Sequence, residues 1–180
     1  MNNKFSTVKL AKLAMMVAIS CALVLVIRIP FPPAPFLEYD PADIPIYITT
    51  FAFGPIAGLA VTLIVSLIQA FALGGSGVYG FLMHMLATGL FVIVAGCLYR
   101  HKKTKKEAII ALISGVVVTV LAMCVFNYFV TPLFMGAPTE AVVAMMIPII
   151  IPFNILKAGI NAVITFLVYK RISGFLHKGL

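Results

Sequence analysis

The chain has 180 residues, of which 63% are hydrophobic and only 10% charged, and its mean hydropathy is +1.16. A soluble domain with a polar surface does not have this composition, so we expect a polytopic membrane protein. The net charge is +8, but the cations are not interleaved with aromatic residues as in a nucleic-acid-binding surface.

The basic residues form three clusters, which predict how the chain is oriented in the membrane. One cluster precedes the first apolar run, one fills the loop 100–106, and one follows the last apolar run. The positive-inside rule places all three clusters, and both termini, in the cytoplasm. The acidic segment 30–43 lies one span away from the first cluster and is therefore expected outside.

We expect a single integral membrane domain over residues 1–180, an all-α bundle of six transmembrane helices. The first apolar run is long enough to span and has no signal-peptidase site after it, so it is interpreted as a retained span. An odd number of crossings must join the outside segment 30–43 to the inside loop 100–106, and the length between them indicates three. Gly54-Pro55 and the glycine-rich stretch 74–77 mark the turns. The expected spans are approximately 10–28, 44–53, 56–73, 79–98, 107–130 and 142–170.

The second of these spans is unusually short. At about 1.5 Å per residue, ten residues cover roughly half of a hydrocarbon core about 30 Å thick. Neighbouring helices must therefore shelter it from lipid. The segments 30–43 and 131–140 are the long segments expected outside.

The first helix carries a stripe of small residues, Ala14, Ala18 and Ala22, at strict i, i+4, i+8 spacing, with Ala11 on the same side. Small residues let helices approach closely in a membrane. Two interpretations remain open: packing inside this bundle, or a docking face for another membrane subunit.

The segment 30–43 predicts a lid over a pocket. Its prolines stiffen an extended path, and its large apolar side chains can cover a ligand. The side chains concerned are Phe31, Phe36, Leu37 and Tyr39.

Two aspartates in this lid segment have alternative interpretations. Asp40 stands before Pro41, and Asp43 follows three residues later, a pattern typical of a capped helix N-terminus. Alternatively, one of the two carboxylates contacts ligand or pairs with Lys157.

Polar residues inside the last two apolar segments mark the candidate ligand site. Asn154, Lys157 and Asn161 recur at i, i+3 and i+7, which places them on one helical face. A lysine flanked by asparagines in an apolar segment indicates a functional site. Asn127, in the preceding segment, lies at a similar outward depth.

Four sequence segments, together with the six-helix plan and the alanine stripe, resemble the S components of energy-coupling factor (ECF) vitamin transporters, and among these the riboflavin-specific members. The segments read LEYDPADIP, FAFGPIAGL, NYFVTPLFMG and IPFNILKAGI. The resemblance implies riboflavin or FMN as the transported ligand, contacted by Asn127, Asn154 and Lys157. It also implies a transmembrane coupling subunit and two ATP-binding subunits as partners. This sequence has no P-loop, so any ATP hydrolysis must come from such partners.

The sequence departs from that resemblance at two positions. A Lys-Asn pair expected in the third helix is replaced by Val65-Ser66, which leaves Gln69 as the nearest amide, and an expected asparagine in the fourth helix gives way to the segment 83–85. Gln69 and His84 are therefore candidate site residues, beside Leu37, Tyr39 and Asp43. Within an apolar helix, His84 is more typical of a hydrogen-bonded core histidine than of a metal ligand. Another heterocyclic vitamin remains an alternative ligand.

Two other classes of protein fit the sequence less well. An enzyme would need paired acids or a Ser/His arrangement at membrane depth, whereas every carboxylate lies in a loop or at a helix end. A self-sufficient secondary transporter usually shows internal repeats and ionisable relays, and neither is evident. We therefore expect a non-enzymatic binding subunit of an ABC-type importer in a prokaryotic plasma membrane.

Overall fold

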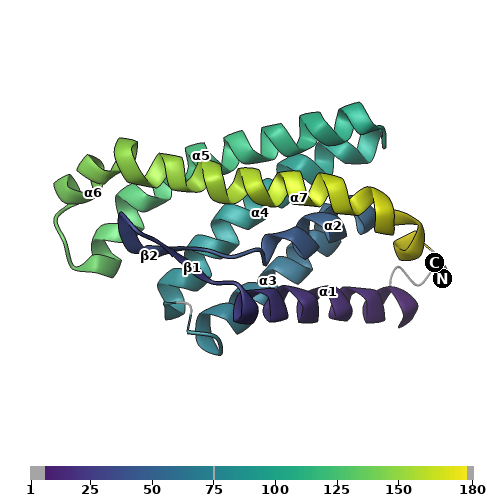
Figure 1. The fold of residues 1–180 in the computed structure, drawn as a ribbon, viewed down its shortest axis with the longest axis horizontal. Coiled ribbons are helices and arrows are strands. Elements are labelled where there is room, and N and C mark those ends of the chain that lie inside the picture. The colour runs from purple at the N-terminus through teal and green to yellow at the C-terminus, as the bar shows by residue number, and fades with distance from the viewer. Residues whose placement is uncertain (1–6, 75, 178–180) are drawn as a thin grey trace.

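The computed structural model describes residues 7–74 and 76–177, which form an elongated helical bundle (Figure 1). Helix α1 begins and helix α7 ends at the same end of this bundle, and α6 lies at the opposite end. In chain order the elements are α1 (Thr7–Val26), β1 (Ile29–Phe31), β2 (Ala34–Tyr39), α2 (Asp43–Phe53), α3 (Pro55–Phe71), α4 (Gly77–His101), α5 (Lys105–Met135), α6 (Thr139–Met145), the π-helical turn η1 (Met146–Ile150) and α7 (Ile151–His177).

Each of the six expected spans contains a helix. Among the described residues, four helical segments are long and apolar enough to cross a membrane: α1, α4, α5 and the continuous stretch Thr139–Ser173. Helix α3 is apolar but shorter. Six crossings stay a prediction, because α2 and α3 do not reach that length. The cytoplasmic location of both termini also stays a prediction.

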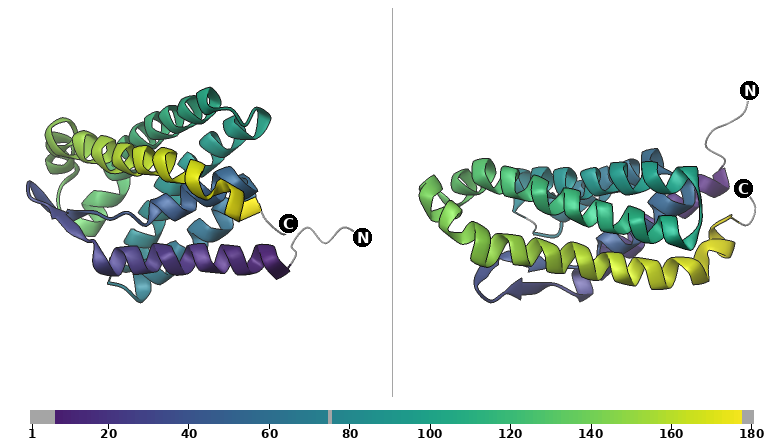
Figure 2. Two further views of the ribbon diagram at one scale, coloured as in Figure 1. Left: turned by 45° about the vertical axis from the view of Figure 1, so that its right-hand side comes forward. Right: turned by 90° about the horizontal axis from the view of Figure 1, so that it is seen from above.

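The short helix α2 is sheltered, as its length predicts. Ten of its eleven residues are buried, and it contacts α1, α3, α4 and α7. In the left view of Figure 2 it lies between α1 and α7. The Tyr47 ring stacks on Phe91 of α4 with centroids 3.7 Å apart, and Phe51 packs against Tyr99 and Tyr169.

Glycine permits the tight packing of α2 against α3 and α4. A methyl group at Gly58 would overlap the hydroxyl of Thr50, and one at Gly96 would lie 2.8 Å from the Thr50 methyl. The predicted turn between α2 and α3 is present: Gly54 has φ +92°, and Pro55 begins α3. Proline at a first helical position loses no hydrogen bond, because that N–H has no intrahelical partner.

The expectation of an all-α fold is wrong in one place, because the segment after α1 contains an antiparallel hairpin. Ile29 pairs with Tyr39 and Pro30 with Glu38, and the register shifts at Pro30/Phe31. Proline has no N–H to donate and is therefore confined to strand edges and irregularities, which a two-stranded hairpin offers.

Two local expectations about helix ends are also wrong. Asp40 does not cap α2: the helix begins at Asp43, its N-cap residue is Ala42, and no side chain caps it. The segment 131–140, expected as an outside loop, is largely helical because α5 continues through Pro132 to Met135. Gly136, with φ +61°, then ends the helix in the left-handed conformation that glycine adopts without strain.

Candidate ligand-binding cavity

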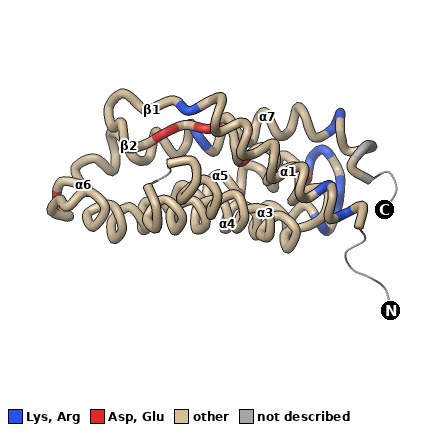
Figure 3. Tube along the Cα trace, turned by 90° about the horizontal axis from the view of Figure 1, so that it is seen from below, with Lys and Arg blue, Asp and Glu red and all other residues tan. Residues whose placement is uncertain are grey.

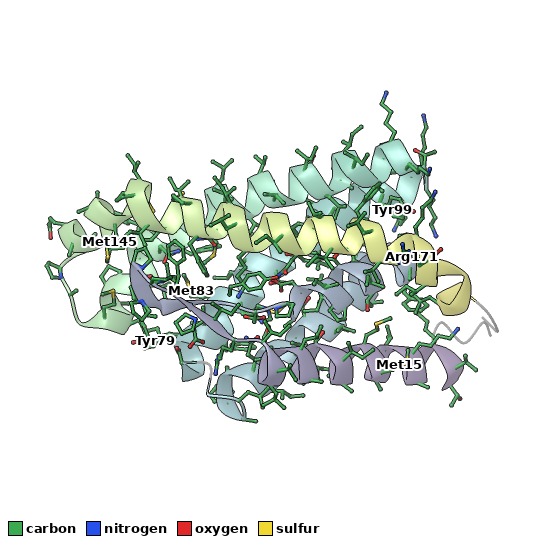
Figure 4. All side chains as sticks on the ribbon, in the orientation of Figure 1. Met15, Tyr79, Met83, Tyr99, Met145 and Arg171 are labelled. Carbon is green, nitrogen blue, oxygen red and sulfur yellow. The ribbon has the colours of Figure 1, made fainter. Side chains whose placement is uncertain are left out.

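A cavity lies in the half of the bundle that carries the hairpin. Its volume is about 1130 Å³, including space open to the surroundings, and its walls come from β2, α2, α3, α4, α5 and α7. Figure 4 shows two of its residues, Tyr79 and Met83, near the hairpin, whereas Tyr99 and Arg171 lie toward the other end. Seven of the eight residues predicted to contact ligand line this cavity: Leu37, Asp43, Gln69, His84, Asn127, Asn154 and Lys157.

The hairpin covers the cavity as the lid interpretation expects. Phe36, Leu37 and Glu38 of β2 line it. The Phe31 ring lies 5.4 Å from Phe153 of α7, and the Phe36 ring lies 6.5 Å from Phe134 of α5. These contacts join the hairpin to α7 and α5, two of the helices that line the cavity.

A buried ion pair joins the lid segment to α7. The Lys157 ammonium donates to Asp40 Oδ2 at 2.8 Å and to the Glu38 carbonyl at 3.2 Å. Asp40 is 2% exposed, and its other oxygen accepts from the Ala42 N–H at 3.1 Å. Of the two alternatives for this aspartate, pairing with Lys157 is therefore correct. Gln69 of α3 also donates to Asp40 Oδ2, at 3.3 Å.

A second polar cluster surrounds Asp43, which is 3% exposed. Its Oδ1 accepts from Thr88 at 2.8 Å and lies 3.1 Å from His84 Nε2, and its Oδ2 accepts from Asn161 at 3.2 Å. A carboxylate only accepts, so Nε2 of His84 carries the proton, and Nδ1 faces the Ser66 hydroxyl at 2.9 Å. His84 is thus the hydrogen-bonded histidine that was expected, in the cavity wall.

Two asparagines in the wall are oriented by their own helices. Asn127 Nδ2 donates to the Met123 carbonyl and Asn154 Nδ2 to the Ile150 carbonyl, each at 2.8 Å. The Asn127 oxygen accepts from Thr131 at 2.7 Å. An amide has two N–H donors, so each asparagine keeps one beyond this helical bond.

Tyr39, also predicted to contact ligand, is not among the residues that line the cavity. Its hydroxyl instead donates to Asn161 Oδ1 at 3.1 Å, and Asn161 donates to the Asp40 carbonyl at 3.2 Å. Burial, and secondarily the neighbouring Asp40 charge, raises the pKa of Tyr39, which keeps the phenol protonated as a donor. Tyr39 and Asn161 therefore hold the hairpin against α7.

Sequence reasoning missed a further attachment of the hairpin. Arg28 Nε lies 2.6 Å from Glu38 Oε2, and its Nη1 donates to the Leu73 carbonyl, two residues beyond the end of α3, at 2.8 Å. The available signal was a single arginine at the end of the first expected span, next to the acidic segment 30–43 that is expected outside.

Comparison with known proteins places the chain in a family. Residues 8–169 match the family model described as the ECF transporter, substrate-specific component. The chain belongs to this family. It is therefore a multi-pass cell-membrane protein and the substrate-binding part of a transporter rather than an enzyme.

Individual relatives agree with this assignment. The S component is 33% identical over 177 residues to the riboflavin transporter RibU of Staphylococcus aureus, covering 94% of this chain and 93% of that protein. It is 27% identical to the riboflavin transporter FmnP of Bacillus subtilis, covering 94% of each chain. A solved structure described as the S component of a bacterial ECF transporter superposes with a TM-score of 0.81 at 31% identity, covering 94% of this chain and 98% of that one.

The charges of this S component are distributed unevenly along the bundle. Most lysines and arginines gather at the end where α1 begins and α7 ends, with others beside the hairpin, whereas acidic residues lie along the hairpin segment and at α6 (Figure 3). The labelled cavity residues Tyr79 and Met83 lie in the half of the bundle away from this basic end.

The alanine stripe of this S component faces outward. Ala14, Ala18 and Ala22 are exposed, as is Ala11. The buried face of α1 consists of Leu13, Met16, Ser20 and Val24. The interpretation of the stripe as packing inside the bundle is therefore wrong, because a different helical face makes the internal contacts.

Proposed function

We propose that this S component captures riboflavin from outside the cell and delivers it for import by ATP-driven partner subunits. The observation that carries the proposal is the convergence of Asn127, Asn154 and Lys157 on one cavity beneath the hairpin. These residues come from α5 and α7 and include a cation and two amides with donors beyond their helical bonds. The names of the related riboflavin transporters support the choice of ligand.

The expected orientation puts the cavity on the outer side. The positive-inside rule assigns the basic end of the bundle to the cytoplasm. The hairpin, at the other end, then covers an entrance from outside. Six crossings with both termini in the cytoplasm are consistent with this arrangement.

The predicted site residues that line the cavity have different roles in this proposal. Lys157 and the two asparagines bind the polar edge of the flavin, and Leu37 covers the ring. Asp43 and His84 line the cavity but have partners within the protein, so they shape the wall.

Ligand capture is tested by purifying the chain in detergent and titrating it with riboflavin. Binding should quench flavin fluorescence at a stoichiometry of one, and protein taken from cells grown with the vitamin should show the absorption of an oxidised flavin. A chain that binds no riboflavin in either measurement contradicts the proposal, and FMN titrated in parallel tests the phosphorylated alternative.

Import requires partners, which we propose are a transmembrane coupling subunit and two ATP-binding subunits. The exposed stripe of α1 is the proposed docking face, because small side chains allow another helix to approach closely. None of its alanines lines the cavity, so docking and binding are separable by mutation.

The docking proposal is tested with Ala14→Leu combined with Ala18→Leu. Riboflavin binding by the isolated chain should persist, whereas ATP-dependent uptake into vesicles containing the full transporter should be abolished. The control replaces two exposed neighbours on α1, Met15 and Ile19, by Phe. Loss of uptake in both double variants, or uptake without ATPase partners, counts against the proposal.

A further inference from the structure

Gln69 lines the cavity and carries a buried hydrogen-bond acceptor that has no partner within the described residues. This acceptor is its side-chain oxygen, Oε1. A buried polar atom without a partner costs free energy, so an unsatisfied acceptor in a cavity wall needs an explanation.

The orientation of the Gln69 amide follows from its other contact. Its amide group faces Asp40 Oδ2 at 3.3 Å, and that carboxylate oxygen also takes a hydrogen bond from Lys157. A carboxylate only accepts, so the NH₂ end of the amide must face it, and the carbonyl end must point elsewhere. The contact with Asp40 therefore fixes Oε1 as the end of the amide that is left without a partner.

Lys157 places a donor beside this acceptor. An ammonium group has three N–H donors, and two of them are directed at Asp40 and the Glu38 carbonyl. One donor remains for a ligand. Because Lys157 and Gln69 share the same oxygen of Asp40, at 2.8 and 3.3 Å, their polar ends are neighbours in the wall.

We propose that Gln69 is a specificity-determining residue, which with Lys157 recognises a ring edge carrying an N–H next to a carbonyl. The inference rests on the proposed function, because the pyrimidine ring of riboflavin carries N3–H between two carbonyls. Lys157 donates to one of these carbonyls, and Gln69 Oε1 accepts from N3–H. The hydrogen bond to Asp40 polarises the amide and strengthens Oε1 as an acceptor.

The test compares riboflavin with N3-methylriboflavin, which lacks the donor. The purified wild-type chain should bind the methylated compound at least tenfold more weakly. In Gln69→Met and Gln69→Leu, riboflavin affinity should fall about 3- to 10-fold, the scale of one lost hydrogen bond. The preference for riboflavin over the methylated compound should shrink by a similar factor.

The ratio of the affinities for riboflavin and N3-methylriboflavin distinguishes a direct contact of Gln69 with N3–H from an indirect effect. A Gln69 variant that merely disturbs Asp40 and Lys157 weakens both ligands equally and leaves the ratio unchanged, which overturns the inference. The matched control is Leu67→Met, exposed on the same helix, which should retain the wild-type ratio. Equal affinity of the wild-type chain for both flavins overturns the inference without any variant. Failure to bind riboflavin at all overturns instead the proposed function.

Discussion

Removing the Lys157 ammonium should destabilise the ligand-free protein by about 3 kcal/mol. In Lys157→Met, the Asp40 carboxylate loses its cation while it stays 2% exposed. Breaking a buried ion pair by removing one partner costs about 3–5 kcal/mol, because the remaining charge is left buried and uncompensated. The lower end of this range applies here, since the Lys157 side chain is 21% exposed and Asp40 keeps the hydrogen bonds from Gln69 and Ala42.

The same reasoning predicts that a second substitution restores stability. Asp40→Asn combined with Lys157→Met removes both charges and leaves no buried ion to solvate. The double variant should lie within about 1.5 kcal/mol of wild type, since replacing a whole buried pair is often close to neutral. The coupling energy between the two positions should therefore exceed about 1.5 kcal/mol.

The measurement is equilibrium unfolding by denaturant in detergent micelles, followed by far-ultraviolet circular dichroism. Flavin must be absent, because bound ligand adds stability by mass action and would hide part of the effect. A loss below about 1 kcal/mol in Lys157→Met would refute the reasoning, as would a double variant whose loss equals the sum of the single losses.

Three further predictions concern binding, topology and packing. Asn154→Leu should lower riboflavin affinity by more than about 1.5 kcal/mol in a fluorescence titration, whereas Ile155→Leu, on the exposed side of α7, should leave it unchanged. In a background lacking the native cysteines, Ser76→Cys should react with an impermeant thiol reagent on intact cells, and Thr104→Cys should react only after permeabilisation. Labelling of Thr104→Cys in intact cells would contradict the proposed orientation. Gly58→Ala should cost about 1–3 kcal/mol in denaturant unfolding because α2 touches α3 there, and wild-type stability would contradict that close contact.

The sequence predicted the helices well because long apolar runs separated by glycine, proline and charge have few alternatives in a membrane. The polar face of α7 was also predicted, since helical spacing alone brings Asn154 and Lys157 together. The hairpin was missed because its prolines argue against a strand, and only the two-stranded arrangement, with its open edges, accommodates them.

The role of Asp40 shows where local patterns fail. An aspartate before proline is typical of a helix cap, and the backbone does use one of its oxygens, through Ala42. The other oxygen accepts a hydrogen bond from Lys157, which is 117 positions away in the sequence. A local pattern cannot weigh a partner that only the tertiary fold brings near, and the same limit hid the contact of Tyr39 with Asn161.

The shortness of α2 accounts for the existence of the cavity. Eleven residues extend about 16 Å, roughly half of a hydrocarbon core, and α2 lies toward the end of the bundle where the termini meet. The missing length, about two and a half helical turns, leaves a space in the other half of the bundle, and the hairpin folds over it. A small membrane protein can thus enclose a ligand without spreading its outer helices apart. An insertion that lengthened α2 would fill the site with backbone. The length of this helix therefore limits the cavity volume that is available to a ligand.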